Sequence, residues 1–143
     1  MIRFCRKVCE GLRQDKEPDM IDAAANSKDF RHRLAVAWYY GHELKPEENL
    51  LKLLCDENLW VRMGAREACE HIACVKYGKT VDFGPASSAD VSEQADSRGL
   101  WEMYFTTREK KIKQAKEEEK LKPEPSKRSP SDILEFEKLG LEK

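Results

Sequence analysis

The chain has 143 residues, of which 40% are hydrophobic and 37% are charged, a composition typical of a single helical domain with a small core. Its formal net charge of −1 gives no overall field that would attract nucleic acid or a membrane surface. No run reaches the roughly 18 apolar residues that a bilayer span needs. The N-terminal stretch MIRFCRKVCEGLRQ carries charges where a signal peptide has its apolar core. We therefore expect a cytoplasmic protein without membrane contact, or a component of a large intracellular or viral assembly.

The first segment predicts one amphipathic helix. Apolar residues recur at helical spacing on one face, namely Ile2, Cys5, Val8, Cys9 and Leu12. We expect this helix to cap one end of the fold.

An internal repeat follows. A shift of 29 residues places Arg33 on Arg62 and His42 on His71, and it aligns IDAAANSKDFRHRLAVAWYYGHE with LLKLLCDENLWVRMGAREACEHIA. Each copy predicts two helices. In the first copy they cover residues 18–25 and 30–42. In the second copy, a Leu-rich helix starting near Pro46 precedes a longer one that Asn58 can cap and that ends near Val75.

The second copy resembles the helix pair of a HEAT repeat, in the short form that is also found in phycobilin lyases. The resemblance rests on a turn aspartate, then VR, and then two spaced alanines, at Asp56, Val61, Arg62, Ala65 and Ala68. It implies that Asp56 closes the turn within the repeat and that the alanines let helices approach closely. It also implies that Arg62, and Arg33 at the equivalent place, pair with acidic or carbonyl groups of a neighbouring repeat.

The stretch YGKTVDFGP, followed by a polar segment and RGLWEMYF, is similar to the end of many bacterial HEAT-like proteins. There a loop leads into a final helix whose aromatic residues, here Trp101, Tyr104 and Phe105, lie on one face. We expect them to close the open end of the repeats, because a terminal repeat otherwise exposes an apolar surface. The helical domain is predicted to cover residues 1–105.

The remainder of the chain is divided into three segments. Residues 106–122 predict a charged, solvent-exposed spacer helix, residues 123–130 a Pro-rich linker and residues 131–143 a short amphipathic helix. The apolar stripe of this last helix predicts a docking peptide, for which packing on its own domain and docking on a partner are equally compatible with the sequence. Its stripe consists of Ile133, Leu134, Phe136, Leu139 and Leu141.

The cysteines and histidines that could form a metal or catalytic site can also be explained by core packing or helix capping. The cluster Cys69, His71 and Cys74 contains soft metal ligands, but helical spacing separates the first two by about 200° and the two cysteines by about 140°. Core packing is therefore favoured over a metal or redox site, and no cofactor is expected. His42 and His71 fit helix capping or a surface position, because no nucleophile or carboxylate constellation accompanies them.

Aromatic residues are the candidates for partner binding. Trp38 is predicted to lie in the core, whereas Tyr39 and Tyr40 point to different sides, so that one of them should reach the surface. Trp60, beside the turn and next to Glu57, is predicted to be partly exposed. An exposed aromatic residue in such a place is typical of an interaction hot spot.

The sequence therefore predicts an all-α fold, a short HEAT-like α-solenoid of about two repeats with capping helices and a charged C-terminal tail. The expected function is non-enzymatic protein–protein interaction, as a small adaptor or structural subunit that binds a protein partner or a neighbouring protomer, with no small-molecule substrate. An alternative is a nucleic-acid-associated subunit that uses the basic run 108–116, with Lys110, Lys111, Lys113 and Lys116. A bilin lyase, suggested by the short repeat form, is a weaker alternative because nothing marks a tetrapyrrole pocket.

Overall fold

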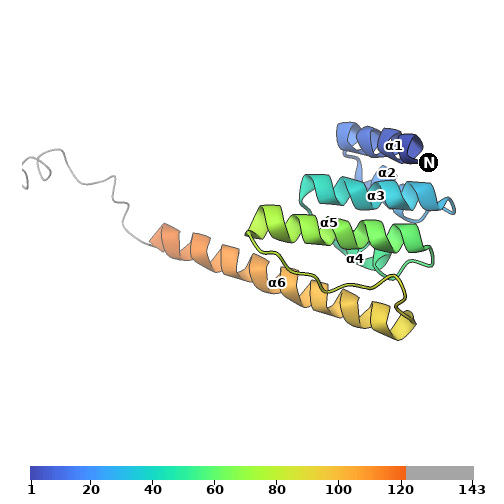
Figure 1. The fold of residues 1–143 in the computed structure, drawn as a ribbon. Coiled ribbons are helices and arrows are strands. Elements are labelled where there is room, and N and C mark those ends of the chain that lie inside the picture. Colours follow the sequence, from blue (N-terminus) through green and yellow to red (C-terminus); the bar gives the residue numbers. More distant parts are fainter. Residues whose placement is uncertain (122–143) are drawn as a thin grey trace, which may run out of the picture. The chain divides into compact units, whose positions relative to one another are not determined.

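The structure is a computed structural model that describes residues 1–121. This part of the chain is all-α, as predicted, with no strand. The helices are α1 (Ile2–Asp15), α2 (Pro18–Ala25), α3 (Phe30–Glu43), α4 (Glu48–Leu53), α5 (Leu59–Tyr77) and α6 (Val91–Leu121) (Figure 1). Contacts divide the chain into two compact units, Met1–Arg108 and Glu109–Lys143.

Some of the sequence predictions fall outside the described residues. They are the Pro-rich linker 123–130 and the docking helix 131–143 with Ile133, Leu134, Phe136, Leu139 and Leu141. Within residues 1–121, no helix is both long enough and apolar enough to cross a membrane.

The two helix pairs begin at the caps that their sequences supply. Asp29 Oδ1 accepts a hydrogen bond from Arg31 N at 3.0 Å at the start of α3, and Asn58 Oδ1 accepts one from Trp60 N at 2.9 Å at the start of α5. The predicted helix pair 18–25 and 30–42 and the Asn58 cap are thereby confirmed. Only the first helix of the second pair differs, since α4 starts at Glu48 and Pro46 precedes it.

In the unit Met1–Arg108, the long helices form a row in the order α1, α3, α5 and the first part of α6, and all of them run in the same direction (Figure 1). The short helices α2 and α4 pack on α3, and α4 also packs on α5. Helix α3 therefore has neighbours on most of its circumference, with α1 on one side and α5 on the other.

The core follows this row. From α1, Cys5, Cys9 and Leu12 are buried, whereas Ile2 is 60% exposed, although its spacing placed it on the inner face. Ile2 lies only about 20° around the helix from buried Cys9, but it is the first residue of α1, so its exposure comes from its place at the helix end. The central part of the core comes from α3, α4 and α5.

The end of the row beyond α5 is covered by the segment 78–90 and α6. Trp101 and Phe105 are fully buried and Tyr104 is partly buried, in line with the predicted aromatic face. Trp101 Nε1 donates to Gly84 O at 2.8 Å, and the ring of Phe83 packs edge-on against Trp101 with 4.9 Å between the ring centroids. The loop thus fills the space between α5 and the aromatic face of α6.

The last helix includes part of the polar segment that precedes Arg98. Helix α6 starts at Val91 and continues without a break through the predicted spacer to Leu121. The reason is local, because Asp90 Oδ1 accepts from Glu93 N at 2.8 Å and its carbonyl accepts from Gln94 N at 2.9 Å. Asp90 acts as a helix cap that starts α6 ahead of its aromatic residues.

Candidate functional site

Small residues set the distance between α3 and α5. A Cβ atom added to Gly41 would lie 3.1 Å from the Cβ of Ala68, and one added to Gly64 would collide with the Leu34 side chain. Side chains this small let two helices pack closely. Ala65 is fully buried, and Ala68 faces α3. Ala68 thus lies where α3 and α5 approach closely, and Ala65 belongs to the core.

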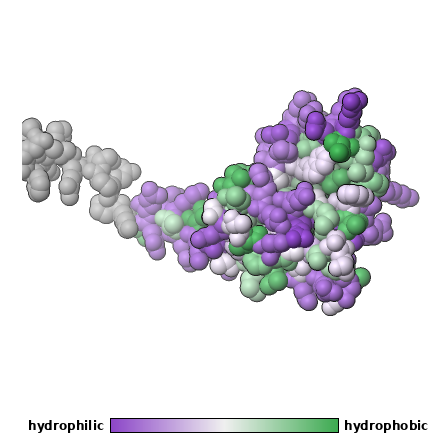
Figure 2. Space-filling model, in the orientation of Figure 1, coloured by the Kyte–Doolittle hydropathy of each residue, from purple (hydrophilic) through white to green (hydrophobic). Residues whose placement is uncertain are grey.

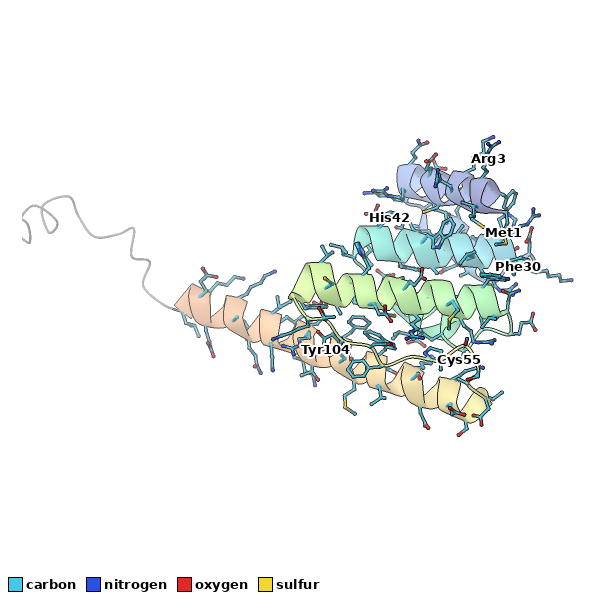
Figure 3. The ribbon with its side chains drawn as sticks, viewed as in Figure 1. Met1, Arg3, Phe30, His42, Cys55 and Tyr104 are labelled. Atoms are coloured by element: carbon cyan, nitrogen blue, oxygen red, sulfur yellow. The ribbon has the colours of Figure 1, made fainter. Side chains whose placement is uncertain are left out.

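The same small residues leave a shallow groove on the surface between α3 and α5. Its volume is about 150 Å³, and it is lined by Trp38, Gly41, His42, Gly64, Glu67, Ala68 and His71. His42, at the C-terminal end of α3 (Figure 3), and Glu67 and His71 on α5 are all exposed. Sites for small organic molecules usually hold roughly 300–1,000 Å³, so this groove has room for one side chain of a partner.

Trp60 lies on the same face of α5 as this groove. Its indole is 58% exposed, and helical spacing places it within about 20° of Glu67 and His71 around the axis. The predicted exposure of Trp60 is confirmed. Figure 2 shows that the surface seen in this view is mainly hydrophilic, with hydrophobic residues in separate patches. Trp60 is thus an exposed aromatic residue on the face of α5 that carries the groove.

The prediction for Tyr39 and Tyr40 is wrong. Both are buried, with 2% of each residue exposed, and their rings pack against each other with 5.2 Å between centroids. Asn49 Nδ2 donates to the Tyr40 hydroxyl at 3.1 Å, and burial raises the pKa of Tyr40. Neither tyrosine reaches the surface because α3 is surrounded by other helices. The aromatic residue of α3 that is partly exposed is instead Trp38, which was expected in the core.

Arg33 and Asp56 form the pair that links the two helix pairs. Arg33 Nε donates to Asp56 Oδ2 at 2.8 Å and Nη2 donates to Oδ1 at 3.1 Å, while Asn58 N donates to the same Oδ1 at 2.9 Å. Asp56 thus closes its own turn and binds an arginine of the preceding pair. The bidentate geometry and the low exposure of both side chains, 10% each, make this a specific contact.

Arg62, at the repeat position of Arg33, binds only its own turn. Its Nη1 donates to the carbonyl of Asp56 at 2.8 Å and to that of Glu57 at 3.1 Å. Within residues 1–121, Nε of Arg62 is buried without a hydrogen-bond partner. The prediction that Arg62 pairs with a group of a neighbouring repeat is therefore wrong for the described residues, in which a loop and α6 follow α5.

Cys5, Cys9 and Cys69 are buried packing residues, whereas the prediction of core packing is wrong for Cys74. Cys69 is fully buried and burial raises its pKa, whereas Cys74 is exposed. Burial also raises the pKa of Cys9, to about 11. All five thiols are unpaired, and residues 1–121 hold no group of three His, Cys, Asp or Glu side chains that could bind a metal ion.

The basic run lies on α6 and spreads around it. Lys110, Lys111, Lys113 and Lys116 are all exposed, but at about 100° per residue Lys111 and Lys116 lie about 140° apart, and Lys113 about 160° from Lys111. A phosphate backbone would therefore meet only part of the run at one time.

No family model matches the chain, and neither a curated protein nor a solved structure matches it. The candidate site therefore rests on the geometry of this molecule. The sequence missed Glu67 and the groove itself. The one signal for the groove in the sequence is Gly64, a glycine inside a strong helical pattern. A glycine there lowers helix stability by about 1 kcal/mol relative to alanine, so its presence indicates close packing against another helix.

Proposed function

We propose that this protein is a short HEAT-like α-solenoid that acts as a non-enzymatic protein–protein interaction module, a small adaptor or structural subunit inside the cell. The observation that carries the proposal is the exposed indole of Trp60 on the face of the α3/α5 groove. The Arg33–Asp56 pair and the close Gly41–Ala68 contact support the HEAT-like part of the proposal, because they are the contacts that such repeats imply.

The groove suits a basic side chain from the partner. Glu67 supplies an exposed carboxylate at its rim, and Trp38 supplies a partly exposed indole that can bind a cation over its face. Trp60 adds apolar area that a partner would bury. The preferred partner is therefore a protein segment with a Lys or Arg flanked by apolar residues.

Trp60→Ala is the direct test. We expect at least a tenfold loss of the partner recovered with the tagged full chain, measured by quantitative mass spectrometry, because buried aromatic anchors contribute about 2 kcal/mol or more. Val91→Ala is the matched control, since Val91 is also an exposed apolar residue but lies on α6. Equal recovery with both variants and the unchanged protein would exclude the groove face as the binding surface.

The nucleic-acid alternative is less well supported, because the cations of the run 108–116 point in several directions. Binding to DNA or RNA measured across salt concentrations tests it. A phosphate-binding run gives a steep loss of affinity with salt.

A further inference from the structure

The outer face of α1 is basic. Arg3, Arg6 and Lys7 are exposed along its first two turns, and Glu10 is the single acid beside them. Arg13, further along, is already bound to Glu43 at 3.2 Å. Three cations against one anion give this surface a formal charge of about +2 at neutral pH.

One of these cations, Arg3, lies in the first turn of α1. The N-terminus of a helix carries a partial positive charge, which favours Asp and Glu in the first turn. Helix α1 has no acid in its first turn and no side-chain cap there, and in residues 1–121 none of Arg3, Arg6 and Lys7 takes part in an ion pair. The three charges are therefore not engaged by other described residues and are available to a binding partner.

The opposite end of the row is acidic. On the first part of α6, residues 91–107, Glu93, Asp96 and Glu102 are exposed. Glu93 and Asp96 lie about 60° apart around the helix axis and share one face, whereas Glu102 lies about 120° from Asp96 on another side. Arg98 is the one basic residue in this stretch of sequence, and it is bound to Glu48. Leu100 and Met103 are exposed between the acids, Met103 at 68%. This face therefore combines the two negative charges of Glu93 and Asp96 with apolar side chains.

We propose that the protein associates with itself head to tail, the basic outer face of α1 in one copy docking on the acidic outer face of residues 91–107 in the next. The two faces lie on helices at opposite ends of the row (Figure 1). They are also similar in length, since the 14 residues of α1 span about 21 Å and residues 91–107 about 25 Å. Exposed Ile2 on α1 and Met103 on α6 add apolar area to the contact.

The two surfaces differ, so the contact is heterologous. An interface of this kind leaves a free face of each type at the ends, and copies continue to add unless the geometry closes a ring. The expected assembly is therefore an open chain or a ring, and not a symmetric dimer. A second copy is favoured over a nucleic acid as the occupant of α1 because only a second copy accounts for the acidic face as well. The proposal does not depend on the α3/α5 groove.

Sedimentation velocity of the full chain, over a range of protein concentrations, tests the proposal. At low salt we expect the average mass to rise with concentration beyond that of a dimer, and to fall towards that of the monomer at about 0.5 M NaCl, where charges are screened over a few ångströms. A wild-type chain that stays monomeric at low salt and high concentration overturns the proposal. If that monomer binds a single-stranded oligonucleotide and loses it on Arg3→Glu/Lys7→Glu, the basic face serves a polyanion instead.

Charge reversal makes the test specific. Arg3→Glu/Lys7→Glu makes both ends acidic, and Glu93→Lys/Asp96→Lys makes both ends basic, so each variant alone should stay monomeric. An equimolar mixture should assemble again, because each reversed face then meets a face of opposite charge. Circular dichroism establishes that both variants keep their helices.

The control reverses two exposed lysines away from both faces, Lys28→Glu/Lys79→Glu, and should assemble like the unchanged chain. Assembly that survives either end reversal, or a mixture that stays monomeric, overturns the proposal. Trp60→Ala should leave the assembly unchanged. The proposal for the groove and the proposal for the end faces can therefore be disproved separately.

Discussion

Asp56 makes a bidentate contact between the two helix pairs. Its carboxylate binds Arg33 through both oxygens and accepts from Asn58 N. Arg33 Nη1 in turn donates to the Ser27 carbonyl at 2.7 Å. One carboxylate therefore holds a buried guanidinium, an adjacent turn and, through that guanidinium, the turn of the preceding pair.

We expect Asp56→Ala to lower the free energy of unfolding by about 3 kcal/mol, because it leaves the largely buried Arg33 without its counter-charge. Urea denaturation followed by circular dichroism measures this loss. Arg33→Met/Asp56→Ala should lose less than the sum of the two single variants, since the unpaired charge is then absent. Additive losses would show that the two side chains do not act as a pair.

Asp29 provides a pH-dependent contact. Hydrogen bonds from Arg31 lower the pKa of Asp29 to about 2, below the ordinary value of about 3.9. A carboxylate with a lowered pKa contributes stability that is complete above about pH 4 and is lost as the pH falls towards 2. Asn at this position still caps α3 but does not titrate.

We therefore expect the unfolding free energy of Asp29→Asn to decline less steeply than that of the unchanged protein between about pH 4 and 2. Urea titrations at several pH values provide the measurement. Parallel pH profiles for the two proteins would mean that the Asp29–Arg31 contact does not form in solution.

At the scale of elements, the contact between α3 and α5 depends on glycine. We expect Gly64→Val to destabilise the protein by about 1–3 kcal/mol, because its side chain meets Leu34 in a packed interface. Gly11→Ala is the control, since a Cβ there meets nothing within 4 Å, and it should be neutral or stabilising by up to about 1 kcal/mol. Thermal unfolding of both variants gives the comparison. A neutral Gly64→Val would contradict the close packing described for these helices.

The sequence predicts elements well where the signal is local. Asn58 marks the start of α5 because an Asn cap acts within three residues, and the 29-residue repeat reveals both helix pairs. The sequence does not predict which residues are buried where neighbouring helices determine the burial. Tyr39 and Tyr40 lie about 100° apart around α3, so one of them would be exposed on a surface helix, but α3 is central. The α3/α5 groove was also out of reach, because it depends on Gly41 and Ala68 facing each other across two helices.

At the scale of the whole molecule, the described core lies in one unit. The buried residues of the described range belong to Met1–Arg108, the last of them being Phe105. We expect a chain that ends at Arg108 to unfold within a few degrees of the full chain, because it loses no buried side chain of the described range, and scanning calorimetry measures this difference. A large drop would show that later residues stabilise the domain. Equal partner recovery with the shortened chain would remove the docking role proposed for Ile133, Leu134, Phe136, Leu139 and Leu141.

The order of the helices in the row also has a consequence for how the protein is made. Within residues 1–121 the packed pairs, α1 with α3, α2 with α3, α3 with α4 and α5, and α4 with α5, join elements that are near neighbours in sequence. Contacts of short sequence separation form quickly, and chains acquire them in N-to-C order during synthesis. The first helix pair can thus be folded against α1 while the second is still being translated, and each new pair finds its packing surface already in place.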